Sequence, residues 1–190
     1  MNNPNGQLTA LHSSPTISLI MTVYNEGQSI RALLECFLAQ TRQPDEIIIV
    51  DGGSTDDTVM ILREYASRLP LKAIGSLGCT ISQGRNIAIQ AAAGDVIAVT
   101  DAGTRPPPEW LANLVAPLAQ DPDLSVSAGF FHADPHTPFE VAMGATVLPL
   151  ADEIDPDVPA VQPQRGLPQN GLGSRRRLPG VDRLLRRPDL

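Results

Sequence analysis

Three short polar clusters carry the side chains in this chain that are best suited to chemistry. They are Tyr24-Asn-Glu26, Asp51-Gly-Gly-Ser54 and Asp101-Ala-Gly103, and each directly follows a run of apolar, β-branched residues. An ionised Asp only accepts hydrogen bonds, so Asp51 and Asp101 suit the N–H and O–H donors of a nucleoside base or ribose. Asp51 is equally compatible with a structural turn, because Asp-Gly-Gly-Ser is turn chemistry by itself.

The apolar runs before these clusters predict buried strands, and amphipathic stretches between them predict helices. Strands that alternate with helices at this spacing predict an α/β fold with a mostly parallel sheet. Because parallel strands end on the same edge, the three clusters should converge on one site. The expected strands are 17–23, 46–50, 71–74, 95–100 and 124–131. The expected helices are 29–40, 81–93 and 109–118. A further helix, capped by Ser54 or Thr55, is expected to end near residue 66.

Composition favours one folded domain and argues against a nucleic-acid partner. The 190 residues are 42% hydrophobic and 18% charged, as in an ordinary globular protein. Residues 1–164 hold 7 basic and 19 acidic side chains, a balance of −12, whereas residues 165–190 hold 7 Arg and 2 Asp, a balance of +5. An acidic body does not suit phosphate-backbone binding. A bound nucleotide would therefore need a local cation, a metal or a helix N-terminus.

The cysteines and the hydropathy pattern bear on the compartment. Cys36 and Cys79 have no CxxC spacing, so we expect reduced thiols. No stretch reaches the ~18 apolar residues of a membrane span, and the N-terminus lacks the order of a secretory signal. The expectation is a cytoplasmic protein, with membrane contact left open but not through a transmembrane helix in this chain.

Four linked motifs in residues 15–120 resemble the opening of a family 2 glycosyltransferase. They are the strand from Ile17 with Tyr24-Asn-Glu26, the segment Asp45 to Asp56, Gly84-Arg-Asn-Ile-Ala88, and Gly94 to Asp101. Together they are far more specific than any one alone. The resemblance implies a Rossmann-like GT-A fold whose C-terminal part is incomplete here. It also implies sugar transfer, with inversion, from a nucleoside-diphosphate sugar to a glycan, lipid-linked or polysaccharide acceptor.

The resemblance also implies roles for the residues after the first two strands. Thr22 and Tyr24 would border the base, with Glu26 in the same donor-binding cluster. Asp51 would accept hydrogen bonds from the base or its ribose. For Tyr24 taken alone, packing at the strand end is the competing interpretation.

Arg85 and Asp101 would lie nearer the diphosphate, by the same resemblance. Asp101 matches the first residue of the family's Asp-x-Asp motif, whose last carboxylate grips a divalent cation. Here the third position is Gly103, which has no side chain. Mg²⁺ or Mn²⁺ would therefore rest on Asp101 and the phosphates, or be absent. Arg85 taken alone is compatible with a solvated helix face.

Inverting transfer needs a general base that takes the proton of the acceptor hydroxyl. In the family this base is an Asp or Glu well beyond the Asp-x-Asp strand. The sequence offers several carboxylates there, none in a recognisable setting, so the catalytic residue stays unknown. The candidates are Asp134, Asp152, Glu153, Asp155 and Asp157.

The sequence changes character near residue 157. We expect a flexible leader over 1–15, a GT-A-like nucleotide-sugar-binding domain over 16–150 and an irregular Pro/Arg-rich tail over 151–190. From Pro159, synonymous codons read one nucleotide later give a Trp-x-x-Val-Gly-Gly-Tyr segment and a Glu-Asp pair, so the tail is compatible with a shifted frame or a truncated transferase. The competing interpretation is a native basic tail that contacts anionic lipid or a partner.

Three functions are compatible with these features. The favoured one is a glycosyltransferase, present as its donor-binding half, and the alternative is a catalytically inactive nucleotide-binding fragment. A dinucleotide oxidoreductase is disfavoured, because no GxGxxG follows the first strand.

Overall fold

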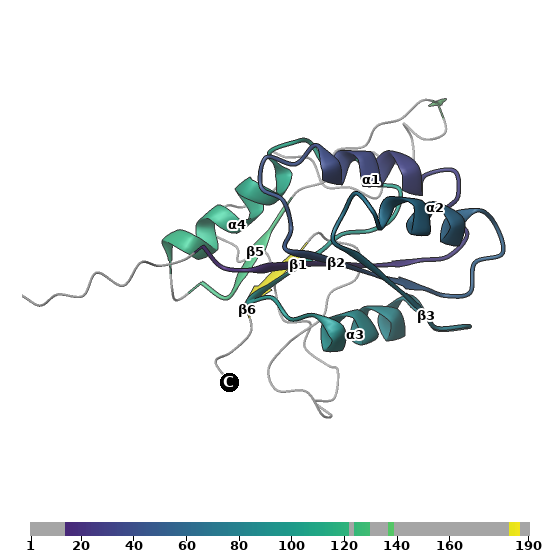
Figure 1. Ribbon diagram of the computed structural model, residues 1–190. Coiled ribbons are helices and arrows are strands. Elements are labelled where there is room, and N and C mark those ends of the chain that lie inside the picture. The colour runs from purple at the N-terminus through teal and green to yellow at the C-terminus, as the bar shows by residue number, and fades with distance from the viewer. Residues whose placement is uncertain (1–13, 122–123, 130–136, 139–182, 187–190) are drawn as a thin grey trace, which may run out of the picture.

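A six-stranded sheet, in the order β3-β2-β1-β4-β6-β5, organises the chain. The computed structural model describes residues 14–121, 124–129, 137–138 and 183–186 (Figure 1). Strands β1 to β4 are parallel, and β6 runs antiparallel to both β4 and β5. The strands are β1 (Ile17–Val23), β2 (Glu46–Asp51), β3 (Leu71–Gly75), β4 (Val96–Val99), β5 (Val126–Ala128) and β6 (Arg183–Arg186).

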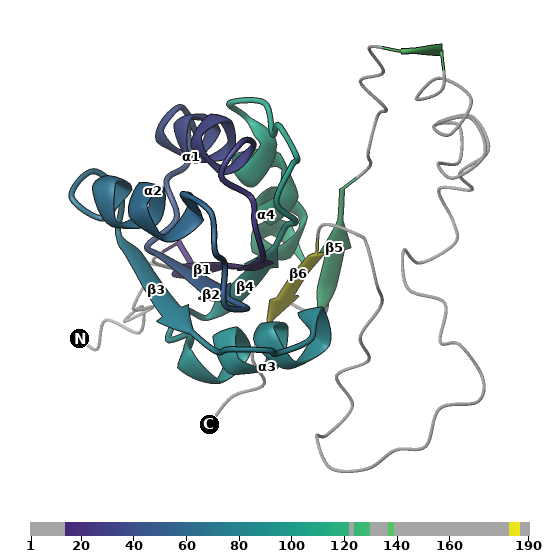
Figure 2. The same ribbon diagram turned by 90° about the vertical axis from the view of Figure 1, so that its right-hand side faces the viewer.

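Helices cover both faces of the sheet, as Figures 1 and 2 show. Three of them lie on one face: α1 (Ile30–Leu38), α2 (Thr58–Tyr65) and α4 (Trp110–Gln120). The fourth, α3 (Ile81–Ala91), lies on the other face. This is the α/β architecture with a mostly parallel sheet that the sequence predicts. No helix in the described part of the chain is long and apolar enough to cross a membrane.

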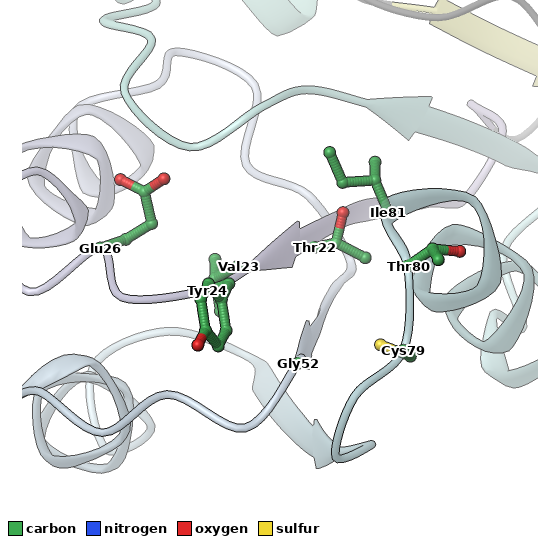
Figure 3. Close-up of a pocket in the computed structure, with 8 residues that line it drawn as sticks. All are labelled: Thr22, Val23, Tyr24, Glu26, Gly52, Cys79, Thr80 and Ile81. Atoms are coloured by element: carbon green, nitrogen blue, oxygen red, sulfur yellow. The ribbon is translucent and has the colours of Figure 1, made fainter.

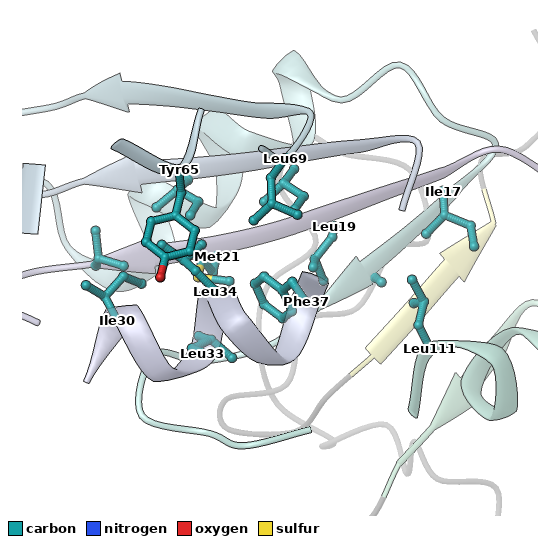
Figure 4. Close-up of a cluster of buried hydrophobic side chains, with 14 of the residues drawn as sticks. Ile17, Leu19, Met21, Ile30, Leu33, Leu34, Phe37, Tyr65, Leu69 and Leu111 are labelled. Carbon is teal, nitrogen blue, oxygen red and sulfur yellow. The ribbon is translucent and has the colours of Figure 1, made fainter. Parts of the chain in front are cut away.

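Two hydrophobic clusters explain why the strands read as continuous apolar runs. In β1, Leu19 and Met21 pack under α1 and α2 (Figure 4). Ile20 packs on the α3 side of the sheet, with Ile48 of β2. All four side chains are fully buried. A strand covered on both faces has no solvent-facing positions, so it loses the alternation typical of a half-exposed sheet.

The start of α2 differs from the expectation that Ser54 or Thr55 caps it. The helix begins two to three residues later, at Thr58, and the side chain of its N-cap residue, Asp57, makes no capping hydrogen bond. The Asp56 carboxylate instead accepts from the Thr58 backbone N–H at 3.0 Å. The Ser54 hydroxyl is engaged with Asp51. The capping prediction was wrong because both candidate residues serve the loop before the helix.

The C-terminal region adds one element that the sequence does not predict. β5 falls within the expected strand 124–131, but Arg183–Arg186 forms β6 inside the range expected to be irregular. Its backbone pairs with β4, with Val96 opposite Arg186. The rest of 151–190, the domain boundary near 150 and residues 1–13 of the expected leader 1–15 lie outside the described residues. The domain division and the shifted-frame hypothesis therefore remain predictions.

A glycine lets α3 sit directly on β1. A Cβ added at Gly84 would lie 2.1 Å from Cγ2 of Thr22, which is closer than any real contact of this kind. The helix therefore depends on the missing side chain for its distance from the sheet. Thr22, a predicted binding residue, and Arg85, which follows Gly84, owe their relative placement to this contact.

We predict that Gly84→Ala destabilises the protein by about 1–3 kcal/mol, the usual effect of overpacking a core. Denaturant unfolding measures the change. Thr22→Ser removes the clashing methyl group. The double variant Gly84→Ala/Thr22→Ser should therefore lose less stability than the two single variants lose together. Gly75→Ala is the control, since nothing lies within 4 Å of its added Cβ. Equal losses for Gly84→Ala and Gly75→Ala would contradict the packing argument.

Candidate functional site

The three polar clusters lie at one edge of the sheet. β1 pairs in parallel with β2, Val23 opposite Asp51, and also with β4, Ile20 opposite Val99. The segments that follow these strands therefore leave the sheet on the same side. The strand order reverses around β1 and β4, which is where open α/β sheets bind ligands.

A pocket of about 190 Å³ opens at this edge (Figure 3). Tyr24 and Glu26 lie on one side of it, and Thr80 and Ile81, at the start of α3, lie on the other, with Thr22 between them. The Tyr24 side chain is 61% exposed, so its ring is available to a ligand. The full lining is Thr22, Val23, Tyr24, Glu26, Gly52, Cys79, Thr80 and Ile81.

Sequence reasoning found one wall of the pocket and missed the other. Thr22, Tyr24 and Glu26 were predicted, whereas the wall at Thr80 and Ile81 was not. A signal for that wall does exist: Thr80 and Gln83 form a capping box, in which the Thr80 hydroxyl accepts from the Gln83 N–H and the Gln83 side chain accepts from the Thr80 N–H. A crossover helix that starts there begins at the carboxyl edge of a parallel sheet.

Asp51 serves a turn in this structure. Its carboxylate accepts from the backbone N–H groups of Gly53, at 3.0 Å, and Ser54, at 3.1 Å. The residue is 7% exposed, and the neighbouring Gly52, rather than Asp51, lines the pocket. Gly53 has a φ of +101°, which favours glycine. Asp51 therefore stabilises the turn, as one of the two interpretations expected. Its hydrogen bonding to a base or ribose stays a prediction.

Arg85 and Asp101 form an ion pair across the gap between α3 and the end of β4. The Arg85 Nη2 donates to Asp101 Oδ1, and the side chains are 17% and 38% exposed. A partly buried pair of this kind is screened less by salt than a surface pair. The structure therefore brings these two predicted residues together, and Arg85 does not lie on a freely solvated helix face.

Hydrogen bonds join the loop after β1 to the loop after β2. Asn25, in the left-handed region with φ 54°, accepts from the Thr55 N–H at 2.8 Å through its side chain. The Gly27 N–H donates to Asp56 Oδ2 at 2.8 Å. The Glu26 N–H donates to the Thr58 hydroxyl, also at 2.8 Å. These bonds, which we call the loop clasp, hold Tyr24 and Glu26 beside the pocket.

The site offers one carboxylate at the place where the family motif would bind a metal. Asp101 is paired with Arg85, and Gly103 has no side chain. Within 14–121 and the shorter described segments, no three His, Cys, Asp or Glu side chains are grouped to hold an ion. The described side chains therefore do not form a metal site of their own. The candidate bases Asp134, Asp152, Glu153, Asp155 and Asp157 lie outside the described residues.

The fold and the position of the edge site define an α/β protein of the GT-A class. The family model for "Glycosyl transferase family 2" matches residues 18–165. This chain belongs to glycosyl transferase family 2, a family of sugar-transferring enzymes.

Curated relatives agree with this family. The chain is 40% identical over 115 residues to undecaprenyl-phosphate 4-deoxy-4-formamido-L-arabinose transferase of Pectobacterium carotovorum subsp. carotovorum (strain PC1), covering 57% of this chain and 35% of the relative. It is 31% identical over 118 residues to hyaluronan synthase of Pasteurella multocida, covering 60% of this chain and 12% of the relative. The chain thus spans about a third or less of these relatives.

Solved structures agree with the fold. The mannosyltransferase PcManGT from Pyrobaculum calidifontis, in complex with GDP-Man and Mn²⁺, matches with a TM-score of 0.56 and 30% identity, covering 60% of this chain and 35% of that one. S. aureus TarS 1–349, in complex with UDP-GlcNAc, matches with a TM-score of 0.51 and 27% identity, covering 55% and 31%.

We predict that Asp56→Ala loosens the loop clasp. The Gly27 amide loses its acceptor, so its hydrogen exchange measured by NMR should become faster than in the unaltered protein. Asp57→Ala is the matched control, because the Asp57 side chain makes no capping hydrogen bond. Unchanged Gly27 exchange in Asp56→Ala would contradict the prediction.

The same carboxylate gives the loop clasp a pH dependence. The Thr58 hydroxyl, and then the Gly27 backbone N–H, donate to Asp56 and hold its pKa below the ordinary value of 3.8. A lowered pKa in the folded state means that the stabilisation is complete above 3.8 and is lost as the pH falls through the lowered pKa. The stability difference between the unaltered protein and Asp56→Ala, from urea unfolding, should stay constant from neutral pH to about pH 4. It should shrink only below that.

Proposed function

We propose that this chain binds a nucleoside-diphosphate sugar at the carboxyl edge of its sheet, as the donor-binding part of a transferase. The sugar would pass with inversion to a glycan, lipid-linked or polysaccharide acceptor. The observation that carries the proposal is the pocket beside the strand-order reversal, with an exposed tyrosine ring on one wall and an arginine–carboxylate pair at the same edge. An acceptor carried on a lipid would bring the chain to a membrane surface.

The base would lie against Tyr24. An exposed aromatic ring at a pocket wall suits stacking on a nucleobase, because every base presents a π face. Thr22 and Glu26, which line the same pocket, would border the base and the ribose. Asp51, on the adjoining strand end, would accept from the base or ribose in addition to its turn bonds with Gly53 and Ser54.

The diphosphate would lie toward Arg85 and Asp101. A guanidinium at this position provides positive charge and several N–H donors where the leaving group gathers negative charge. PcManGT was solved with Mn²⁺, so a divalent cation at Asp101 is the alternative source of positive charge, which binding with and without Mn²⁺ distinguishes. The proton of the acceptor hydroxyl would go to a general base that the described residues do not supply.

Ligand binding tests the proposal directly. We expect UDP or GDP to stabilise the full chain, and NAD to leave it unchanged. At a ligand concentration about 100 times the Kd, the stabilisation is about 2.7 kcal/mol, or roughly 5–10 °C in Tm. Thermal shift with UDP, GDP, dTDP and NAD, each with and without Mn²⁺, measures it. Stabilisation by NAD alone would overturn the proposal, while UDP or GDP binding without sugar transfer would indicate an inactive nucleotide-binding fragment.

We also predict that Tyr24→Ala weakens nucleotide binding without unfolding the protein. Loss of base stacking costs about 1–3 kcal/mol, or roughly 5- to 150-fold in Kd. The ring is mostly exposed, so the Tm without ligand should barely move. Tyr24→Phe keeps the ring and is the matched control. Isothermal titration calorimetry with UDP and GDP measures the Kd, and equal affinities of Tyr24→Ala and Tyr24→Phe would exclude stacking.

A further inference from the structure

The ion pair between Arg85 and Asp101 is more buried than an ordinary surface ion pair. The Arg85 side chain is 17% exposed, and its Nε is buried without a hydrogen-bond partner among the described residues. The guanidinium is therefore fixed by packing as well as by its bond to Asp101. Its position is set by α3, which Gly84 holds against β1.

Among the described residues, the same edge is poor in ligands for a divalent cation. Mg²⁺ and Mn²⁺ take oxygen ligands, and a nucleotide site usually adds one or two protein carboxylates to the substrate phosphates. Asp101 supplies one carboxylate, but its Oδ1 already accepts from a cation. At Gly103, where the family motif has its second carboxylate, φ is +86° and an added Cβ would have no atom within 4 Å. Position 103 therefore has room for a carboxylate side chain, but glycine supplies none.

We propose that this chain holds the diphosphate of its donor without a divalent cation, with the Arg85 guanidinium, oriented by Asp101, as the counter-charge. The proposal rests on the proposed function, since it concerns the same nucleotide. It assigns Asp101 to positioning Arg85 rather than to binding metal.

Arginine is chemically suited to this position. Its guanidinium stays protonated and carries five N–H donors in a planar fork that matches phosphate oxygens. One donor on Nη2 is used by Asp101, and Nε is enclosed, which leaves three N–H groups at the tip of the side chain. Two of these can bind one phosphate bidentately. Partial burial keeps the charge effective at physiological ionic strength.

The first experiment measures the affinity of the full chain for UDP and GDP by isothermal titration calorimetry, in EDTA and again in Mn²⁺. We expect the Kd to change by less than about threefold between the two conditions. Binding that is about tenfold or more tighter in Mn²⁺ would overturn the inference and leave the proposed function standing. No binding in either condition would overturn both.

Two variants at position 103 sharpen the test. Gly103→Asp supplies the missing carboxylate, so UDP binding should become tighter in Mn²⁺ than in EDTA. Gly103→Asn has nearly the same shape and the same backbone strain at positive φ but no charge, so it is the matched control. The electron paramagnetic resonance signal of Mn²⁺ with UDP present should report bound metal for Gly103→Asp alone. A bound-metal signal in the unaltered chain would contradict the inference.

Variants at Arg85 test the counter-charge. Arg85→Gln should weaken UDP binding in EDTA by roughly 10- to 150-fold, the effect of losing charge-assisted hydrogen bonds. Arg85→Lys keeps the positive charge but lacks the planar fork of N–H donors, so its affinity for UDP in EDTA should lie between those of the unaltered protein and Arg85→Gln. Circular dichroism and the Tm without ligand check that each variant folds. Unchanged affinity of Arg85→Gln in EDTA would overturn the proposal even if metal independence holds.

Discussion

The structure depends on one constraint: β1 is paired in parallel on both sides and covered by helices on both faces. Because these strands are parallel and in fixed register, the loops after β1, β2 and β4 all leave the sheet at its carboxyl edge. The same double coverage requires the close contact between Gly84 and Thr22. A single packing distance thus connects the core of the sheet to the side chains of the candidate site.

Most of this fold follows from the sequence because the central strands are buried on both faces. Runs such as Glu46–Asp51 can be recognised from composition alone, and the helices between them have clear apolar stripes. The start of α2 could not be found in this way, since Ser54 and Thr55 are both plausible caps and only the loop geometry shows that the N-cap is Asp57. β6 could not be found either, because Arg183–Arg186 gains its strand structure from distant partners rather than from its own pattern.

The candidate site was predictable in part, for a related reason. Tyr24, Asp51 and Asp101 were visible because each lies at or just after the end of a strand. The wall at Thr80 and Ile81 follows a loop whose path depends on tertiary contacts, so residue type gave little indication of it. The partner of Arg85 was also hidden, because 16 positions separate it from Asp101. Sequence placed residues at the edge, and packing decided which of them meet.

The loop clasp has a consequence for molecular recognition. The three backbone N–H groups of the loop clasp, from Glu26, Gly27 and Thr55, are already satisfied by side chains before any ligand arrives. The conformational entropy of this rim is therefore lost when the chain folds and not when a guest molecule enters. Encounter on this side should be governed by diffusion and orientation, with little rearrangement of the main chain.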